Sequence, residues 1–440
     1  MFTKIYIDNY MGISSPIELE FISKSRGREN NAFVYKTEDG IYINKMIGII
    51  GGNASGKTSI VGALNSIGSL LIKPILQFNI EDKFEELQEL LEQEENSENR
   101  RKFTSVMEDY TSSIDIRFQN LRRANEDTTL RVEMYITSEN VDLTGYYTYE
   151  IVVNSAEKNV KKEIFTFRKK YKSKEEYLVD IENAKEGQVY YINRFSSNLN
   201  NIVDISNDKK EKLERQKQYI SCFVKHYIEH SEAITTSQAA IYKDVKYIDW
   251  YKKSEKEFTS LAKLVDPKIS HMIIDTDRRR EELHFVLKDG SEITRNLLST
   301  GTDRFLMTVR LVNDVIEKKG VILIDEIEMN LHRDLAGTIL RLFGCAQKNN
   351  SQIIFTTLSA EIFDMLDENH KKIFKQDMIC VLDSVPNGVK VDKLIDLKVA
   401  GQRVKGDASA TNLYKDKKIA IQPDMMEIND FLVEYISRLL

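Results

Sequence analysis

One stretch, MIGIIGGNASGKTSI at Met46–Ile60, constrains the fold of this chain more than any other part of the sequence. It begins with a short run rich in isoleucine, which is typical of a buried strand. Gly51–Thr58 then has the spacing G-x-x-x-x-G-K-T, and a helical pattern follows from Ser59. A strand, a glycine-rich loop and a helix in this order form the setting of a phosphate-binding P-loop. The stretch therefore predicts a nucleotide-binding α/β domain.

The residue types in this loop suit a bound triphosphate. Glycines let backbone N–H groups turn inward around a phosphate, and the following helix points its positive end at the same place. We expect Lys57 to reach the β- and γ-phosphates of ATP and the Thr58 hydroxyl to hold Mg²⁺. The predicted cradle consists of Gly51, Gly52, Asn53, Ala54, Ser55, Gly56, Lys57, Thr58 and Ser59. The alternative is a chance glycine-rich turn, which the flanking strand and helix disfavour.

A second motif lies far downstream, where the apolar run Val321–Ile324 ends in Asp325 and Glu326. Such a run predicts a buried strand with carboxylates at its C-terminal end, where ligands bind in α/β sheets. This is a Walker B pattern, which is a weak match by itself and becomes specific when it occurs together with the P-loop upstream. We expect Asp325 to hold Mg²⁺, directly or through water, and Glu326 to orient and polarise the attacking water.

A third motif, Leu298-Ser-Thr-Gly301, opens another predicted helix. Ser299 and Gly301 offer a phosphate a hydroxyl, an unhindered backbone N–H and a helix dipole. One copy of the chain cannot readily apply both this site and its own P-loop to one phosphate. We therefore expect a head-to-tail homodimer, or a higher homo-oligomer, with two ATP molecules in the interface. The alternative is a simple N-cap made by Ser299 or Thr302.

The composition restricts the class of protein. The chain has 440 residues, 41% hydrophobic and 30% charged, which predicts two or three domains with a real core. No run of about 18 apolar residues indicates a membrane helix, and the N-terminus lacks a signal-peptide pattern. Three widely separated cysteines give neither a zinc spacing nor a disulfide framework, so we expect a cytoplasmic protein. The net charge of −6 disfavours non-specific coating of nucleic acid but leaves room for a local basic groove.

Periodicity along the chain divides it into five predicted parts. They are an N-terminal ATPase lobe with the P-loop (1–74), an acidic helix with an antiparallel β lobe (75–200), a helical insert (201–270), a C-terminal ATPase lobe with the signature and Walker B motifs (271–400), and a C-terminal partner or docking segment (401–440). Period-two patterns at 114–118, 130–136, 146–153 and 164–167 predict the strands of the β lobe. Residues 205–265 are predicted to be helical, either as a projecting arm or lid or as a packed subdomain.

The three motifs, in this order, resemble those of the ABC-type ATPases of the SMC, RecF and OLD group. The similarity is greatest to stand-alone bacterial ABC-type ATP-binding proteins, often placed in the AAA family. It is carried by Gly52–Lys57, Leu298–Thr302 and Asp325–Glu328, with Leu331-His332 after the last. The resemblance covers the N-terminal fifth of the chain and residues 264–400.

This resemblance implies the fold and a role. The fold class is α/β, a P-loop NTPase of the ABC-ATPase-head type, with a mixed central sheet, an antiparallel β lobe and an inserted helical arm. The implied cofactors are ATP and Mg²⁺, and the implied activity is ATP hydrolysis. Members often act in anti-phage defence beside a separate effector, a nuclease or another toxic protein. We find no Asp-x-Asp pair after Glu326, so we expect no nuclease domain within this chain.

Two departures from the family pattern bear on activity. The family often has a histidine in a Thr-Thr-His pattern after the strand that follows Walker B, and Leu358 stands at that place here. A leucine side chain cannot hydrogen-bond a γ-phosphate, so hydrolysis is expected to be slow, or the chain acts mainly as an ATP-gated switch. The glutamine of the Q-loop is also unassigned, with Gln77 and Gln119 as candidates.

Three functions remain open on the sequence alone. The first is an ATPase that regulates an effector, which Glu326 favours. The second is an SMC/RecF-like DNA-repair ATPase that binds DNA through its insert, with nucleic acid as partner. The third is a non-hydrolysing ATP-dependent scaffold, which Leu358 favours. Basic residues between Arg403 and Lys418, with Tyr414 among them, form either a docking segment for a partner or nucleic acid, or a solvated loop.

Overall fold

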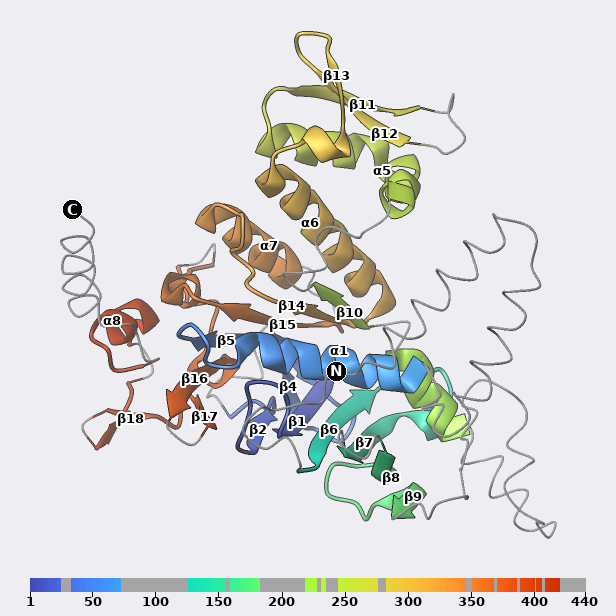
Figure 1. Cartoon of the computed structure of the whole chain (residues 1–440), viewed down its shortest axis with the longest axis vertical. Coiled ribbons are helices and arrows are strands. Elements are labelled where there is room, and N and C mark those ends of the chain that lie inside the picture. The colour runs from blue at the N-terminus through green and yellow to red at the C-terminus, as the bar shows by residue number, and fades with distance from the viewer. Residues whose placement is uncertain are drawn as a thin grey trace, which may run out of the picture.

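The computed structural model of the chain is organised around two six-stranded sheets (Figure 1). It describes residues 1–24, 33–72, 126–154, 159–182, 218–227, 231–234, 244–275, 282–345, 350–367, 370–385, 388–399, 401–405 and 408–419. The predicted acidic helix, the strand at 114–118 and both glutamine candidates lie outside these residues. The five-part division of the chain stays a prediction.

The first sheet is antiparallel throughout, in the order β2-β1-β6-β7-β8-β9. Its strands are β1 Phe2–Asp8, β2 Ile17–Glu20, β6 Thr128–Ile136, β7 Gly145–Asn154, β8 Asn159–Arg168 and β9 Glu176–Glu182. The three strands predicted between 130 and 167 are confirmed, and strands from both sides of the expected boundary at 74/75 share this one sheet. Alternate residues such as Ile5 and Ile7 of β1, and Tyr147 and Tyr149 of β7, face one buried core.

The second, central sheet is mixed, as predicted, in the order β10-β14-β15-β5-β16-β17. Its strands are β5 Met46–Gly51, β10 Ser231–Ile234, β14 Val321–Ile324, β15 Gln352–Thr357, β16 Ile379–Val385 and β17 Gly388–Lys393. The first five strands in that order are parallel, and β17 closes the edge by pairing antiparallel with β16. The parallel strands bring their C-terminal ends, including those of β5 and β14, to the same edge of the sheet.

Helices cover both faces of the central sheet. Helix α1, Lys57–Ile72, lies between it and the antiparallel sheet, while α6, Thr300–Lys318, and α7, Arg333–Cys345, cover the opposite face (Figure 1). The central strands are therefore apolar on both sides: Val321 and Leu323 face the α1 core, and Ile322 and Ile324 face the α6 core. This explains why β14 is a continuous apolar run rather than an alternating one.

The segment expected to be helical at 205–265 contains a strand, so the prediction of a purely helical insert is wrong there. β10 pairs in parallel with β14 at the edge of the central sheet, Ser231 opposite Val321. Residues 218–227 and helix α5, Asp244–Val265, are helical as expected. Phe258 and Ala262 of α5 are buried in the α6 core, so this part of the insert packs against α6, at the end of the molecule away from the central sheet in Figure 1.

Smaller elements complete the described structure. A three-stranded sheet sits above α5 and the start of α6 in Figure 1. The strands of this sheet are β11 Ile269–Asp275, β12 Glu282–Leu287 and β13 Glu292–Thr294. Two short hairpins are formed by β3 Val34–Lys36 with β4 Tyr42–Asn44 and by β18 Lys398–Val399 with β19 Gln402–Arg403. The remaining elements are helix α8 Ala410–Lys415 and the 3₁₀ helices η2 Val141–Leu143, η5 Arg295–Leu297, η6 Ala360–Asp364 and η7 Gln376–Met378. Within the described ranges, no helix has the length and apolar character needed to cross a bilayer.

One buried amide joins the two large sheets. The Gln352 side chain, at the start of β15, is completely buried. Its Oε1 accepts from Phe2 N–H at 2.7 Å, and its Nε2 donates to the carbonyls of Phe2 and Asn44, each at 3.0 Å. A buried amide with these three bonds is well satisfied, so it fixes β1 of the antiparallel sheet against the central sheet.

Candidate nucleotide-binding site

The glycine-rich loop connects the C-terminal end of β5 to the first residue of α1. Ala54 and Gly56 adopt left-handed backbone angles, with φ of 58° and 91°, which curl the chain back on itself. A Cβ atom on Gly51 would lie 2.3 Å from the Ser55 hydroxyl and 2.8 Å from the Leu382 carbonyl. The loop therefore needs glycine at position 51 because its neighbours approach the backbone there.

The Lys57 side chain folds back over this loop. Its Nζ donates to the carbonyls of Gly51 at 2.8 Å and Gly52 at 2.7 Å, and the residue is only 6% exposed. Burial lowers the pKa of Lys57, while the nearby carboxylates of Glu326, Asp325 and Glu328 oppose that shift. The amine is thus already held at the mouth of the loop, within the field of the Walker B carboxylates.

The other predicted cradle residues differ in exposure, some forming an exposed rim and others lying buried beneath it. Asn53, Ala54 and Thr58 are exposed on the rim. Ser55 and Ser59 are buried: the Ser59 hydroxyl accepts from Gly12 N–H at 3.4 Å, and the Ser55 hydroxyl has no hydrogen-bond partner among the described residues.

Asp325 follows β14 and is completely buried. Its Oδ1 accepts from the Thr356 hydroxyl at 2.6 Å, but its Oδ2 is buried without a partner in the part of the chain that the structure describes. An unpaired buried carboxylate oxygen is costly unless a cation or donor completes it. Mg²⁺ in nucleotide sites is held by few protein oxygens together with phosphates and water, so Asp325 and the exposed Thr58 hydroxyl fit that ion. The described residues contain no cluster of three or more His, Cys, Asp or Glu side chains placed to cage a metal by themselves.

Glu326 turns sharply away from the strand end, with a left-handed φ of 47°. Its N–H donates at 2.7 Å to the same Thr356 hydroxyl that bonds Asp325. Thr356 lies on β15, between β14 and β5 in the sheet, and Ile327 N–H also donates to its carbonyl at 3.0 Å. Thr356 therefore orients both carboxylate residues, a role that sequence reasoning missed because it depends on the order of the strands.

Glu328 reaches the position where the family often has histidine. Its Oε1 accepts from the backbone N–H of Leu358 at 2.6 Å, and its Oε2 is buried without a partner among the described residues. Leu358 thus contributes its main chain, not its side chain, to the site. The motif Asp325-Glu-Ile-Glu328 was the available signal, but the sequence does not show which loop its last carboxylate contacts.

Arg304 is a second residue that the sequence analysis did not assign. It is buried one turn into α6, and its Nη2 donates to the Asp325 carbonyl at 3.1 Å. Its Nε and Nη1 have no partner among the described residues, and burial lowers its pKa against the opposing effect of Asp325 and Glu326. The spacing Arg304, Thr308, Leu311 placed it on the buried face of α6 and could have revealed it.

The signature motif forms the start of α6. The Ser299 hydroxyl accepts from Thr302 N–H at 3.1 Å, so Ser299 is the N-cap that the alternative interpretation predicted. A Cβ on Gly301 would lie 2.7 Å from the Asn330 carbonyl, which places this glycine against the loop after Walker B. In Figure 1 this end of α6 lies apart from the loop at the start of α1. One chain therefore places Lys57 near the Walker B carboxylates, and among the described residues the Ser299 hydroxyl bonds only Thr302 of its own helix.

A protein-family model described as "AAA domain, putative AbiEii toxin, Type IV TA system" matches residues 46–364, well over half of the chain. The chain belongs to this family. The match spans all three motifs, and together with the sheet order it confirms the predicted fold class and the resemblance to AAA-family ABC-type ATPases.

Solved structures with similar shape include three SMC heads. One, bound to the C-winged helix domain of ScpA, is 11% identical with a TM-score of 0.44, covering 89% of this chain and 97% of that chain. The SMC head domain from Thermotoga maritima is 12% identical with a TM-score of 0.37, covering 90% and 99%. A third, with an extended coiled coil and bound to the C-terminal domain of ScpA derived from Pyrococcus furiosus, is 12% identical with a TM-score of 0.40, covering 89% and 95%. No curated protein sequence matches this chain.

Proposed function

We propose that this AAA-family chain is an ATPase that binds and hydrolyses ATP with Mg²⁺, dimerises over two ATP molecules, and regulates a separate effector protein. Two features found together carry the proposal. Lys57 is held over the P-loop, and a buried carboxylate oxygen of Asp325 has no protein partner in the described structure. The two residues follow parallel strands of one sheet, at the edge where nucleotides bind.

ATP binding would use groups that are already in place. Lys57 would exchange its bonds to the Gly51 and Gly52 carbonyls for bonds to the β- and γ-phosphates. The backbone N–H groups at the start of α1 would add their dipole, and Thr58 and Asp325 would hold Mg²⁺. When bound, that ion would neutralise charge on the phosphate oxygens.

Hydrolysis would depend on Glu326 as the residue that orients and deprotonates water. Its backbone is fixed by the Thr356 hydroxyl, so its carboxylate starts from a defined position. Glu328 would support the same site by holding the Leu358 N–H, which keeps the loop after β15 beside the Walker B residues although no histidine is present. The hydrogen bond from the Thr356 hydroxyl holds Asp325 by its Oδ1 and leaves its Oδ2 to face the proposed ion.

Dimerisation would bring the signature helix to the nucleotide of the other copy. The hydroxyl of Ser299 already caps α6, so a phosphate would compete for a group that is correctly placed and oriented. Asp303, in the first turn of α6, is neutralised by a two-point pair with Arg295, with bonds of 2.6 and 3.1 Å. That pair removes a negative charge that would otherwise repel the phosphate.

Regulation of an effector, and a role in anti-phage defence, rest on the resemblance to stand-alone bacterial ATP-binding proteins. The family description names a putative toxin of a type IV TA system, which is compatible with a role beside another protein. If ATP converts the monomer to a dimer, the two states would present different surfaces, and a partner could bind one of them preferentially.

ATP turnover of the wild type and of Glu326→Gln tests this proposal. We expect turnover to fall by about 100-fold or more, because a general base is removed, while ATP affinity stays within about three-fold. The neutral variant should then accumulate as an ATP-dependent dimer in size-exclusion chromatography with light scattering. Ser299→Arg, combined with Glu326→Gln, should abolish that dimer and leave ATP affinity intact.

Other outcomes would point to the other functions. ATP binding and dimerisation without turnover in the wild type would favour a scaffold, in line with Leu358 at the histidine position. Tight DNA binding that weakens steeply with salt would favour a DNA-repair ATPase. A monomer at saturating ATP would contradict the proposed dimer.

A further inference from the structure

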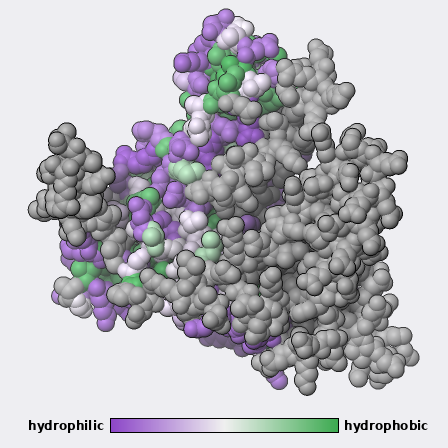
Figure 2. Space-filling model, viewed as in Figure 1, coloured by the Kyte–Doolittle hydropathy of each residue, from purple (hydrophilic) through white to green (hydrophobic). Residues whose placement is uncertain are grey.

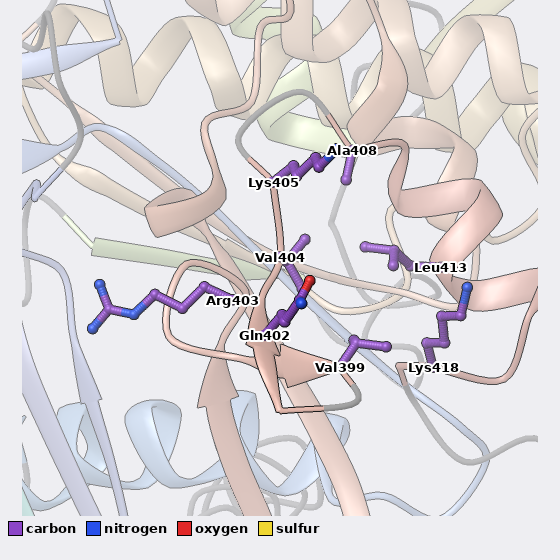
Figure 3. A pocket seen from close by; sticks show the side chains of 8 residues that line it. All are labelled: Val399, Gln402, Arg403, Val404, Lys405, Ala408, Leu413 and Lys418. Carbon is purple, nitrogen blue, oxygen red and sulfur yellow. The ribbon is translucent and has the colours of Figure 1, made fainter.

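A cavity of about 390 Å³ lies outside the nucleotide site, between the β18–β19 hairpin and α8 (Figure 3). Figure 3 shows Val399, Val404 and Leu413 in its middle, with Lys405 and Lys418 on two sides and Arg403 reaching outward from its rim. The lining therefore combines an apolar floor with a cationic edge, and none of its described residues is acidic.

The charge around this cavity runs against that of the chain as a whole. Residues 398–418 contain six Lys or Arg and two Asp, a local excess of four positive charges, whereas the whole chain has a net charge of −6. Arg403 and Lys405 are exposed, while Lys418 pairs with Asp416 at 2.6 Å. Figure 2 shows hydrophilic and apolar residues side by side over α8 and β18. Such a surface attracts anionic groups and also offers contacts for apolar side chains.

The wall of the cavity is firmly attached to the ATPase domain through Asp364. This carboxylate accepts from the Ser409 hydroxyl at 2.7 Å, from Thr411 N–H at 2.9 Å and from Ala410 N–H at 3.1 Å, so it caps α8. Burial would raise the pKa of Asp364, but these bonds and the nearby Lys372 lower it to about 2. The α8 side of the cavity is therefore a built part of the fold.

Asp364 also places the cavity close in sequence to the loop after β15, which contains Leu358. It is the last residue of η6, Ala360–Asp364, which begins two residues after Leu358. Lys372 donates to both Asp364 at 3.1 Å and the carbonyl of the lining residue Ala408 at 2.8 Å. The residue that anchors α8 therefore lies six positions along the chain from Leu358, whose N–H Glu328 holds.

We propose that this cavity is a docking site for an acidic segment of a partner protein that carries apolar side chains between its carboxylates. Carboxylates would pair with Arg403 and Lys405, and apolar side chains would enter between Val399 and Leu413. Single-stranded nucleic acid fits less well, because its binding sites use aromatic stacking platforms, and none of the described lining residues is aromatic. That the partner is the regulated effector rests on the proposed function; the docking itself does not require ATP.

Fluorescence anisotropy with the full chain and labelled peptides tests the docking site. The probe is a 12-residue peptide in which Glu or Asp alternates with Leu or Phe. The comparison probes are the same peptide with Lys for each acid, the same peptide with Gly for each apolar residue, and a 12-nucleotide single-stranded DNA. We expect the acidic amphipathic peptide to bind about ten-fold or more tightly than each comparison probe.

Two variants and a matched control locate the binding. Arg403→Glu with Lys405→Glu should weaken binding of the acidic amphipathic peptide by about ten-fold or more. Lys253→Glu with Lys256→Glu makes the same change of charge on exposed positions of α5, far from the cavity, and should have no effect. Val399→Ser should weaken the amphipathic peptide by about three-fold or more, and should leave the weak binding of the glycine-substituted peptide unchanged.

Each other result would overturn the docking site. Peptide binding that survives the Arg403/Lys405 reversal would place the interaction elsewhere. Stronger binding of the DNA probe, lost in that variant, would assign the cavity to nucleic acid. A changed oligomeric state of the variant without nucleotide would assign it to a second copy of the chain. Because none of these measurements needs ATP, a failure of docking can be told apart from a failure of the ATPase proposal.

Discussion

The N-terminal ends of α1 and α6 carry motifs of similar composition, but their hydrogen bonds and backbone conformations differ. At α1 the preceding loop curls through Ala54 and Gly56 in left-handed conformations, and Lys57 is the side chain held over it. At α6 the end is closed by its own residues, because Ser299 caps the helix and Asp303 pairs with Arg295. The first end therefore places a cation over a curled loop, whereas the second end is closed by hydrogen bonds among its own residues.

This difference explains why the two motifs are expected to act in different copies. A phosphate site needs a helix N-terminus and a nearby cation, and α1 begins at Lys57. The Asp325 Oδ2, which has no partner among the described residues, belongs to the same site. At the start of α6, the Ser299 hydroxyl can bind a phosphate only if it gives up its hydrogen bond from Thr302 N–H. ATP affinity should therefore depend on α1, while α6 should matter mainly after a second copy arrives.

The largest expected effect comes from Lys57→Ala. This change removes the buried amine that bonds the Gly51 and Gly52 carbonyls, so ATP affinity should fall by about 100-fold or more in equilibrium binding with a fluorescent ATP analogue. Lys390→Ala removes an exposed lysine on β17 of the same sheet and serves as the control. Unchanged ATP affinity in Lys57→Ala would break the comparison of the two helix ends.

A smaller effect is expected from Glu328→Ala. It leaves the Leu358 N–H without its acceptor, so we expect kcat to fall by about ten-fold with little change in ATP affinity. Glu328→Gln keeps an oxygen acceptor and should recover most of the rate. Equal losses in the two variants would show that the charge of Glu328, and not its bond to Leu358, is what matters.

The smallest expected effect is that of Ser299→Ala in the monomer. Loss of the N-cap should cost about 1 kcal/mol of stability and lower the melting temperature by about 2 °C, measured by calorimetry. Ser299→Thr keeps the hydroxyl and is the matched control. ATP affinity of the monomer should not change, and a loss comparable to that of Lys57→Ala would mean that both helix ends contact the same nucleotide.

The sequence was sufficient for those parts of the site that are built from neighbours along the chain. The strand, loop and helix around Lys57, the buried run before Asp325 and the start of α6 were all predicted where the structure has them. In each case periodicity and glycine spacing within about ten residues determine the local structure, so no distant partner is needed to recognise it.

The parts that were missed depend on distant pairing. β10 has the sequence Ser-Glu-Ala-Ile, too short and too polar to be recognised, and it is a strand only because β14 pairs with it. Thr356 and Arg304 act at the site because strand order and helix packing bring them to Asp325 from β15 and α6. Helical spacing marks Arg304 as buried, but no local pattern specifies that it or Thr356 contacts Asp325.

The Gln352 amide has a consequence for how this molecule can move. Because it ties β1 to the central sheet from inside the core, the antiparallel sheet and the nucleotide-binding sheet should travel together as one rigid block. Any rearrangement that follows ATP binding is then expected on the opposite side of the central sheet, in α6, α5 and the small sheet, where α6 is bonded to the end of β14 through Arg304.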